Sequence, residues 1–314
     1  MAAKLCLDAA GQRLNRVLYI DKVTCEVKVI KCRSLVVAAS PCESARLLLN
    51  SKSKHCPAGM ANSSGMVGKR LRDSVSVAGA SYFPRLRNLP PHNHDGMGRP
   101  HLWVEKGVLP GTQQSNQFHF FFAGGRTLPL SSDFTEVSDR LEGYGFSLKR
   151  GCRELYGTTM FFVASGKMFS NDACFCAIDP DKTDKWGIPT LQFSFKWSDS
   201  DKHTAKAMQD SFLAVTEAAG GTYLTPAERS TGAFPHGLSP GGQGFHEQGT
   251  AVMGNNREHS VVNSFGQTHD IPNLFVLDAS MFPSSSHKPP TLTILALSWR
   301  GSEYLVTQAV KHLL

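Results

Sequence analysis

The feature that most constrains this 314-residue chain is a glycine-dense segment near its C-terminus, followed by a short strand and a helix start. Residues 246–254 read His-Glu-Gln-Gly-Thr-Ala-Val-Met-Gly, and four more glycines lie just before them. The apolar run 274–277 then ends in Asp278, and Pro290 opens a helical pattern. Glycine lets backbone approach a flat ligand closely, and α/β folds collect nucleotides at strand ends and helix N-termini. The segment therefore indicates an α/β ligand site, although a simple cap would explain Asp278 equally well.

The last part of this segment predicts an amphipathic helix. Its apolar and small residues recur at helical spacing, at Thr291, Leu292, Leu295, Ala296 and Trp299. The free N–H groups and the positive dipole end of such a helix favour negative charge on a ligand. A plain core helix is the alternative, and both descriptions can hold together.

The N-terminal quarter predicts three short strands and then a helix. The strand candidates are 14–19, 27–29 and 35–39. Ser40-Pro41-Cys42-Glu43 follows, where the serine suits an N-cap, the proline suits the first helical position and the glutamate completes a capping box. The helix carries core residues Ala45, Leu48 and Leu49 and ends near Asn50. A strand, a tight turn and a helix N-terminus can hold an anion, and a purely structural corner fits the pattern as well.

The middle of the chain has a different character. Residues 117–122 and 190–197 read as strands, and the second alternates, with Leu191, Phe193, Phe195 and Trp197 on the predicted core face. Residues 203–219 have helical spacing that ends at Gly220-Gly221, and residues 128–138 read as a loop. This pattern predicts an α+β region built on an antiparallel sheet.

Composition excludes several classes of protein. Hydrophobic residues at 41% and charged residues at 19% fit a globular chain. No apolar run approaches the ~18 residues of a spanning helix, and residues 1–20 do not read as a secretory signal, so the chain as it stands is expected to be cytoplasmic. The eight cysteines lack metal spacing, and no metal site is expected. Residues 1–88 carry the excess of positive charge behind the net charge of +7, without a compact basic cluster, which favours a solvated or partner-facing surface over nucleic acid. Such a surface would also suit a cofactor with a diphosphate.

The order of these motifs resembles the C-terminal signature of the glucose–methanol–choline (GMC) flavoprotein oxidoreductases, with the greatest similarity to the large subunit of gluconate-type dehydrogenases. The resemblance extends upstream through residues 91–96, Pro-His-Asn-His-Asp-Gly, and 184–189, Asp-Lys-Trp-Gly-Ile-Pro. Residues 65–73, from the Gly-x-x-Gly loop to its trailing Asp, are also similar to the family. No Gly-x-Gly-x-x-Gly fingerprint occurs, so we expect the N-terminal dinucleotide-binding half of such an enzyme to be missing.

The resemblance implies an α/β fold with an incomplete FAD-binding domain and an α+β substrate domain. Residues 1–77 and 241–314 would form the partial FAD-binding domain, and 78–240 the substrate domain. The implied FAD contacts are Ala39, Ser40, Gly249, Thr250, Asp278, Ala279, Pro290, Thr291 and Leu292. At Ser40 the family usually has glycine, which puts close approach of the backbone to the cofactor in question.

The resemblance also implies two catalytic residues. His246 would take the hydroxyl proton while hydride leaves the adjacent carbon for flavin N5, and imidazole suits this task because it titrates near neutral pH. The second position, where the family has Asn or His, is Pro289 here, which has no side-chain donor or acceptor. His287 is the candidate substitute.

The predicted function is FAD-dependent oxidation of a CH–OH group in an alcohol, sugar or sugar-acid substrate. The expected partners are this small molecule and a complementary N-terminal chain or an electron-acceptor subunit, with no nucleic acid and no membrane span. Alone, the chain is expected not to hold FAD tightly. The alternative is a non-catalytic fragment, or one half of a split enzyme, that acts as an interaction module; the loss of a side-chain donor at Pro289 supports it.

Overall fold

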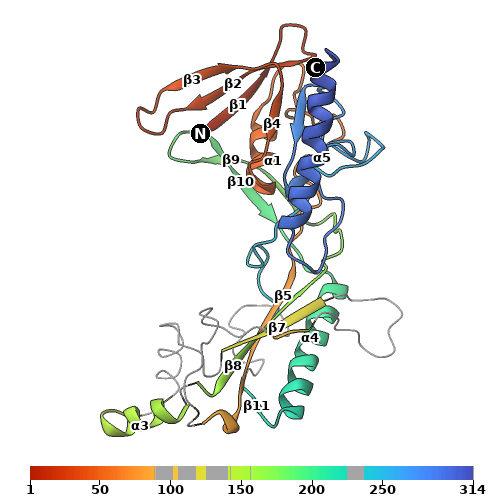
Figure 1. The fold of residues 1–314 in the computed structure, drawn as a ribbon. Coiled ribbons are helices and arrows are strands. Elements are labelled where there is room, and N and C mark those ends of the chain that lie inside the picture. The colour runs from red at the N-terminus through yellow and green to blue at the C-terminus, as the bar shows by residue number, and fades with distance from the viewer. Residues whose placement is uncertain are drawn as a thin grey trace. The chain divides into compact units, whose positions relative to one another are not determined.

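The computed structural model describes residues 1–87, 89, 102–104, 118–124, 141, 143–155, 157–224 and 237–313 (Figure 1). They divide into two compact units. The first combines Met1–Ser74, Met168–Ser198 and Phe245–Leu314, and the second combines Val75–Lys167 and Asp199–Gly244. Residues 168–198, expected within 78–240, pack instead with the first unit. The motif at 91–96 and the predicted loop at 128–138 lie outside the described residues.

The first unit begins with a three-stranded antiparallel sheet in the order β1-β2-β3, made of β1 (Ala2–Leu7), β2 (Leu14–Ile20) and β3 (Val27–Lys31). The sequence predicted β2 and β3. It missed β1, in which Ala2, Ala3 and Lys4 have low strand propensity. Asn273, far along the chain, joins this sheet, since its side chain accepts from Leu14 N (2.9 Å) and donates to Leu14 O (2.7 Å).

A parallel strand pair connects the N-terminal and C-terminal parts of the chain. β4 (Leu35–Val37) pairs with β12 (Leu274–Val276), residue for residue from Leu35 opposite Leu274. β4 leads into α1 (Pro41–Asn50), and β12 leads into the 3₁₀ helix η4 (Ala279–Met281) and then α5 (Thr291–Val310). Both predicted strands and both predicted helices are present, and the turns that follow the two strands therefore lie at the same end of the pair.

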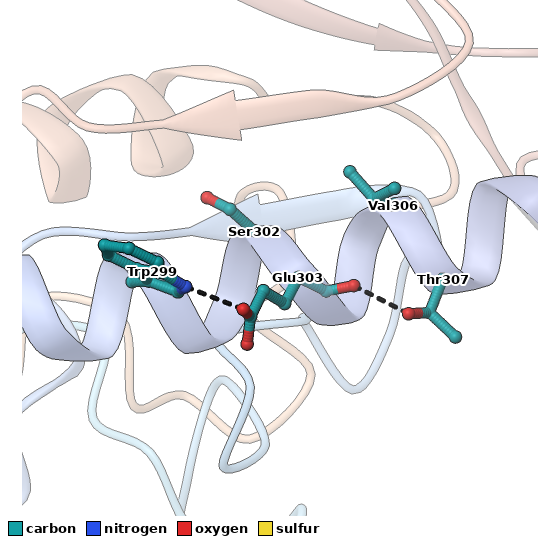
Figure 2. Close-up of a pocket in the computed structure, with 5 residues that line it drawn as sticks. All are labelled: Trp299, Ser302, Glu303, Val306 and Thr307. Atoms are coloured by element: carbon teal, nitrogen blue, oxygen red, sulfur yellow. Dashed lines mark hydrogen bonds between the residues drawn. The ribbon is translucent and has the colours of Figure 1, made fainter.

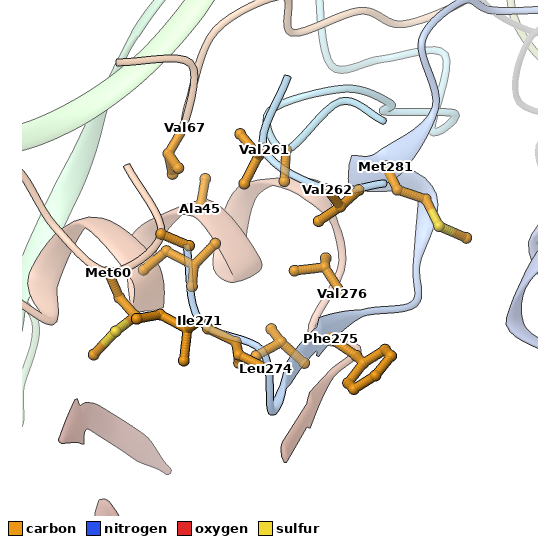
Figure 3. Packing of buried hydrophobic residues seen from close by; sticks show 14 of the residues in the cluster. Ala45, Met60, Val67, Val261, Val262, Ile271, Leu274, Phe275, Val276 and Met281 are labelled. Atoms are coloured by element: carbon orange, nitrogen blue, oxygen red, sulfur yellow. The ribbon is translucent and has the colours of Figure 1, made fainter. Parts of the chain in front are cut away.

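The core of this unit lies between α1, β12 and the loops that precede β12 (Figure 3). Ala45 and Leu48 of α1 are fully buried, as predicted, and so are Leu274, Phe275 and Val276. At about 25 cal/mol per Å² of apolar surface, a fully buried Leu or Phe contributes roughly 1.5–3 kcal/mol. The predicted α1 and β12 segments are thus fixed by the same buried contacts.

A hairpin of β9 (Phe175–Thr183) and β10 (Pro189–Ser194) packs against α1. Arg46 of α1 donates to Asp184 Oδ2 at 2.8 Å and to Pro189 O at 2.8 Å. Burial alone would raise the pKa of the Asp184 carboxyl, but hydrogen bonds from Arg46 and from two backbone N–H groups lower it below its ordinary value. The predicted core face of β10 is wrong at Phe193, which is 57% exposed, because a hairpin buries only the part that packs on a neighbouring element.

The second unit is a five-stranded antiparallel sheet with a long helix against one face (Figure 1). The strand order is β11 (Thr222–Tyr223), β5 (Val75–Tyr82), β8 (Thr159–Gly166), β7 (Phe118–Gly124) and β6 (Leu102–Val104). α4 (Asp199–Ala218) covers it through Phe212, whose ring lies 5.0 Å from Phe162 and 5.6 Å from Phe120. α4 ends before Gly220, which has φ 72°, as the sequence predicted.

The described part of the second unit also contains two shorter elements, the 3₁₀ helix η1 (Pro84–Leu86) and α3 (Phe146–Leu155). In the described parts of both units, no helix combines the length and the apolar character needed to cross a bilayer.

Candidate active site

Asp278 joins the turns that follow β4 and β12. Its Oδ2 accepts hydrogen bonds from Ser40 N (3.1 Å) and from Ser44 Oγ (2.6 Å). Its Oδ1 accepts from Ser280 N (2.8 Å) and from the Ser280 hydroxyl. Four protein donors thus occupy this buried carboxylate, which gives Asp278 a structural role. Its direct contact with a cofactor stays a prediction.

The start of α1 departs from the predicted capping box. Ser40 holds the N-cap position and Pro41 the first helical position, but the Ser40 side chain makes no capping hydrogen bond. Instead, Ala39 N donates to Ser44 Oγ at 3.1 Å. Ser40 has φ 73° and ψ 161°, a conformation that is nearly restricted to glycine. The serine therefore keeps the backbone conformation that a glycine would adopt, held by its N–H bond to Asp278.

Gly249 and Thr250 contact the same two turns, which follow β4 and β12. Gly249 N donates to Ala279 O at 3.1 Å, and Thr250 Oγ1 donates to Pro41 O at 2.7 Å. A Cβ atom on Gly249 would lie 2.1 Å from the carbonyl oxygen of Arg70. Glycine is required here because two backbone segments meet. The structure thus brings together the predicted residues around positions 40, 250 and 279.

A cavity of about 300 Å³ opens beside the turn at Ala39. Its charged and polar lining comes from Lys22, Glu43, Arg46 and Asn50, and its remaining lining is mainly apolar, from Met1, Ala2, Ala3, Leu47 and Ile188. Ala39 and Ser40 are exposed, although the N–H groups of both residues donate within the protein. An exposed turn at a strand end, beside a cavity with apolar walls and charged side chains of both signs, can take part of a nucleotide-bearing cofactor.

The N-terminus of α5 is open in a different way. Pro290 is the N-cap and offers no side-chain cap, while Thr291 and Leu292 are exposed. An uncapped first turn leaves backbone N–H groups without intrahelical partners. These groups, with the positive end of the helix dipole, suit an anionic or electron-rich ligand edge.

The predicted apolar face of α5 is not its core face. Leu292 is 79% exposed, Leu295 62% and Trp299 71%. The helix packs through the opposite residues instead, namely Ile294, Leu297, Gly301, Tyr304 and Leu305. α5 is apolar on both sides, so spacing alone could not decide which side would be buried.

A second cavity, of about 730 Å³, lies along the exposed side of α5. Figure 2 shows its lining residues, Trp299, Ser302, Glu303, Val306 and Thr307. Trp299 Nε1 donates to Glu303 Oε1 at 2.7 Å, which fixes the indole ring along the helix. All five residues come from one helix, and the cavity has no titratable group besides Glu303.

His246 is held by residues 72–74. Arg72 and Gln248 form an antiparallel bridge, in which each N–H donates to the other's carbonyl oxygen at 2.9 Å. Beyond the bridge, Asp73 Oδ1 accepts from both Ser74 N (2.7 Å) and His246 N (3.1 Å). Ser74 Oγ lies 3.0 Å from His246 Nδ1. Asp73 and Ser74 are buried, whereas His246 is half-buried.

Ser74 and the role of Arg72 were not predicted from the sequence. The Asp73 that follows the Gly-x-x-Gly loop was a signal, but nothing in the sequence pairs it with a residue 173 positions away. Arg72 is fully buried, and its guanidinium donates to Phe282 O and, at 3.3 Å, to Ser170 Oγ. Burial, with Arg70 nearby, lowers the pKa of Arg72 to about 10.

The second predicted catalytic residue, His287, is half-buried in the segment between η4 and α5, and Pro289 is exposed. A pairing of His287 with His246 stays a prediction. Among the described residues, no group of three or more His, Cys, Asp or Glu side chains is arranged to hold a metal ion.

Comparisons with known proteins agree with the predicted family. Residues 174–298 match the C-terminal family model of the GMC oxidoreductases. The 2-methyl-1,2-propanediol dehydrogenase of Mycolicibacterium austroafricanum is 30% identical over 295 residues, which are 91% of this chain and 50% of that protein. The gluconate 2-dehydrogenase flavoprotein of Pantoea cypripedii is 28% identical over 169 residues, 54% of this chain and 27% of that protein. The chain is thus related to the GMC oxidoreductases, as its motifs predicted.

A solved structure shares the fold. The formate oxidase of Aspergillus oryzae RIB40, in a study of FAD modification, superposes with a TM-score of 0.67 at 14% identity, covering 100% of this chain and 60% of that one. The chain spans about half the length of the first curated relative that it matches.

Proposed function

We propose that this relative of the GMC oxidoreductases supplies the catalytic histidine and part of the FAD site of an enzyme that oxidises a CH–OH group. The observation that carries the proposal is the position of His246. A half-buried imidazole, anchored through its backbone to Asp73 and through Nδ1 to Ser74, lies in the same segment as Gly249 and Thr250. That segment is joined to the starts of α1 and η4, the two turns where cofactor contacts are expected.

Two parts of the chain would hold FAD. The exposed turn at Ala39 and Ser40, with the cavity beside it, would receive part of the nucleotide, where Lys22 provides positive charge. The open first turn of α5, at Pro290, Thr291 and Leu292, would face the flavin edge that becomes electron-rich on reduction. Gly249, Thr250, Asp278 and Ala279 would contribute by fixing the turns between them.

Bound FAD would supply the hydride acceptor, at flavin N5. His246 would take the proton of the substrate hydroxyl, so that the carbon loses hydride and the oxygen loses its proton while a carbonyl forms. Its Nδ1 faces Ser74, which leaves Nε2 as the atom for this proton transfer. His287 is proposed as a second polar group for the substrate oxygen.

The proposed substrate is a small alcohol, sugar or sugar acid. The relatives named above are a diol dehydrogenase and a gluconate dehydrogenase, which support this class. We also propose a polypeptide partner, either a complementary chain with a dinucleotide-binding unit or a subunit that accepts electrons; a relative named as the large subunit of a fructose dehydrogenase supports this proposal.

The test is flavin reduction by the full chain, mixed with FAD and with 2-methyl-1,2-propanediol or gluconate, and followed by anaerobic absorbance. His246→Ala should slow reduction by roughly 10²–10⁴-fold, as expected for loss of a general base. His259→Ala, at an exposed histidine of the same unit, is the matched control and should leave the rate unchanged. An equal rate in His246→Ala would remove His246 from the mechanism. No reduction by the unmodified chain, even with a complementary dinucleotide-binding chain added, would favour the non-catalytic alternative.

A further inference from the structure

Ser74 lies two residues after Arg72, which forms an isolated antiparallel bridge with Gln248. Beyond this bridge, side-chain hydrogen bonds connect the two segments. The N–H of His246, two residues before Gln248, donates to the Asp73 carboxylate and not to a backbone carbonyl. The same carboxylate oxygen accepts from Ser74 N. One buried oxygen therefore fixes the backbone of both residues, and their side chains meet at 3.0 Å. A hydrogen bond to a charged acceptor is among the stronger ones in proteins.

The hydrogen bond between Ser74 Oγ and His246 Nδ1 has two possible directions. If Nδ1–H donates to Ser74 Oγ, Nε2 carries a lone pair and can accept a proton. If the serine hydroxyl donates to Nδ1, the ring proton lies on Nε2, which can then only donate. A hydroxyl can take either role, but only the first direction is compatible with a base at Nε2.

We infer that Ser74 is a positioning residue that holds His246 as the Nδ1–H tautomer, with Nε2 as the proton acceptor. This inference rests on the proposed function, because the base role selects the direction of the hydrogen bond. Ser74 is 1% exposed and Asp73 is also 1% exposed, so water does not compete for these groups. Ser74 acts through His246 and does not itself contact the reacting atoms. The Asp73 carboxylate accepts from the backbone N–H of His246 and so fixes the place of this residue beside Ser74.

The experiment measures the tautomer directly, without flavin or turnover. The full chain is labelled with ¹⁵N-histidine, and long-range ¹H–¹⁵N spectra are recorded at alkaline pH; His246→Gln identifies the signal among the twelve histidines. A pyrrole-type shift for Nδ1 and a pyridine-type shift for Nε2 are expected. In Ser74→Ala the ratio of Nδ1–H to Nε2–H should fall by about tenfold, the factor expected for loss of one hydrogen bond. Ser74→Thr keeps the hydroxyl and should restore the ratio.

Ser81→Ala is the matched control, because it also removes a buried serine hydroxyl, one that bonds Thr216 Oγ1 at 2.6 Å in the second unit. It should leave the His246 signals in place. A dominant Nε2–H tautomer in the unmodified chain, or an unchanged ratio in Ser74→Ala, would overturn the inference. Flavin reduction is scored separately: a chain with the Nδ1–H tautomer but no activity with any partner would contradict the proposed function and leave the role of Ser74 intact. An active chain with the Nε2–H tautomer would contradict the role of Ser74 and the use of Nε2 as the base, but not the oxidation of a CH–OH group by the chain.

Discussion

The N-termini of α1 and α5 are both expected to face a cofactor, yet they are built in opposite ways. At α1, the turn residues are bonded to protein: Ser40 N and Ser44 Oγ donate to Asp278, and Ala39 N donates to Ser44. At α5, Pro290 caps the helix without a side-chain bond, and the first turn is exposed. One helix start is saturated by the protein, and the other is open.

This difference assigns the two helix starts different tasks. Hydrogen-bonding capacity that is used within the protein fixes geometry but is lost to a ligand. The α1 turn is therefore best suited to present its shape and the adjoining cavity, whereas the α5 turn can offer its N–H groups and its dipole. The comparison predicts that changes at α1 act mainly on folding and that changes at α5 act mainly on binding.

The largest expected effect is at Asp278. Asp278→Ala removes the acceptor of four hydrogen bonds and leaves buried donors unsatisfied, so the free energy of unfolding of the first unit should fall by about 3–5 kcal/mol. Urea denaturation followed by circular dichroism measures this change. Asp172→Ala is the control, because the Asp172 side chain is 95% exposed and its removal should cost less than about 0.5 kcal/mol. Equal stability of the two variants would mean that the hydrogen bonds of Asp278 do not stabilise the two turns.

The elements around Asp278 could be predicted from the sequence, but the contacts between them could not. The strands around Leu35 and Leu274 and helices α1 and α5 were predicted, because each has a local signal such as an apolar run or a proline. The cofactor contacts expected at positions 40, 249 and 278 stay predictions. The contacts among the strands and helices were not predicted, because the Asp278–Ser44 bond joins residues 234 positions apart. The packing of residues 168–198 with the first unit, the exposed side of α5 and the Ser74–His246 pair have no such local signal. Each depends on which surfaces meet, and local spacing carries no information about that.

A smaller effect of opposite sign is expected at Ser40. Its φ of 73° and ψ of 161° are costly for a residue with a Cβ atom, and its side chain makes no capping bond. Ser40→Gly should therefore raise the free energy of unfolding by about 1 kcal/mol, the relief of strain being partly offset by the greater freedom of glycine in the unfolded chain. Thermal unfolding measures the gain. Ser302→Gly, on the exposed side of α5, should instead lose roughly 0.5 kcal/mol, because glycine weakens a helix interior. A loss in both variants would show that Ser40 is not strained.

The smallest expected effect on stability is at Thr291. This variant is informative because stability and FAD affinity should change in opposite directions. Thr291→Glu places a negative charge in the open first turn of α5, which should stabilise the helix by roughly 0.3–1 kcal/mol at low salt. The same charge would occupy the dipole end proposed for the flavin edge, so FAD affinity, measured by fluorescence quenching with the partner chain present if one is needed, should fall. Thr291→Gln is the matched control, because glutamine is nearly isosteric with glutamate but uncharged. It should change neither the stability nor the FAD affinity much. If Thr291→Glu raises stability but leaves FAD affinity equal to that of Thr291→Gln, the α5 turn is an ordinary helix start. Loss of both differences at about 1 M salt, where the screening length is about 3 Å, would confirm that they arise from charge.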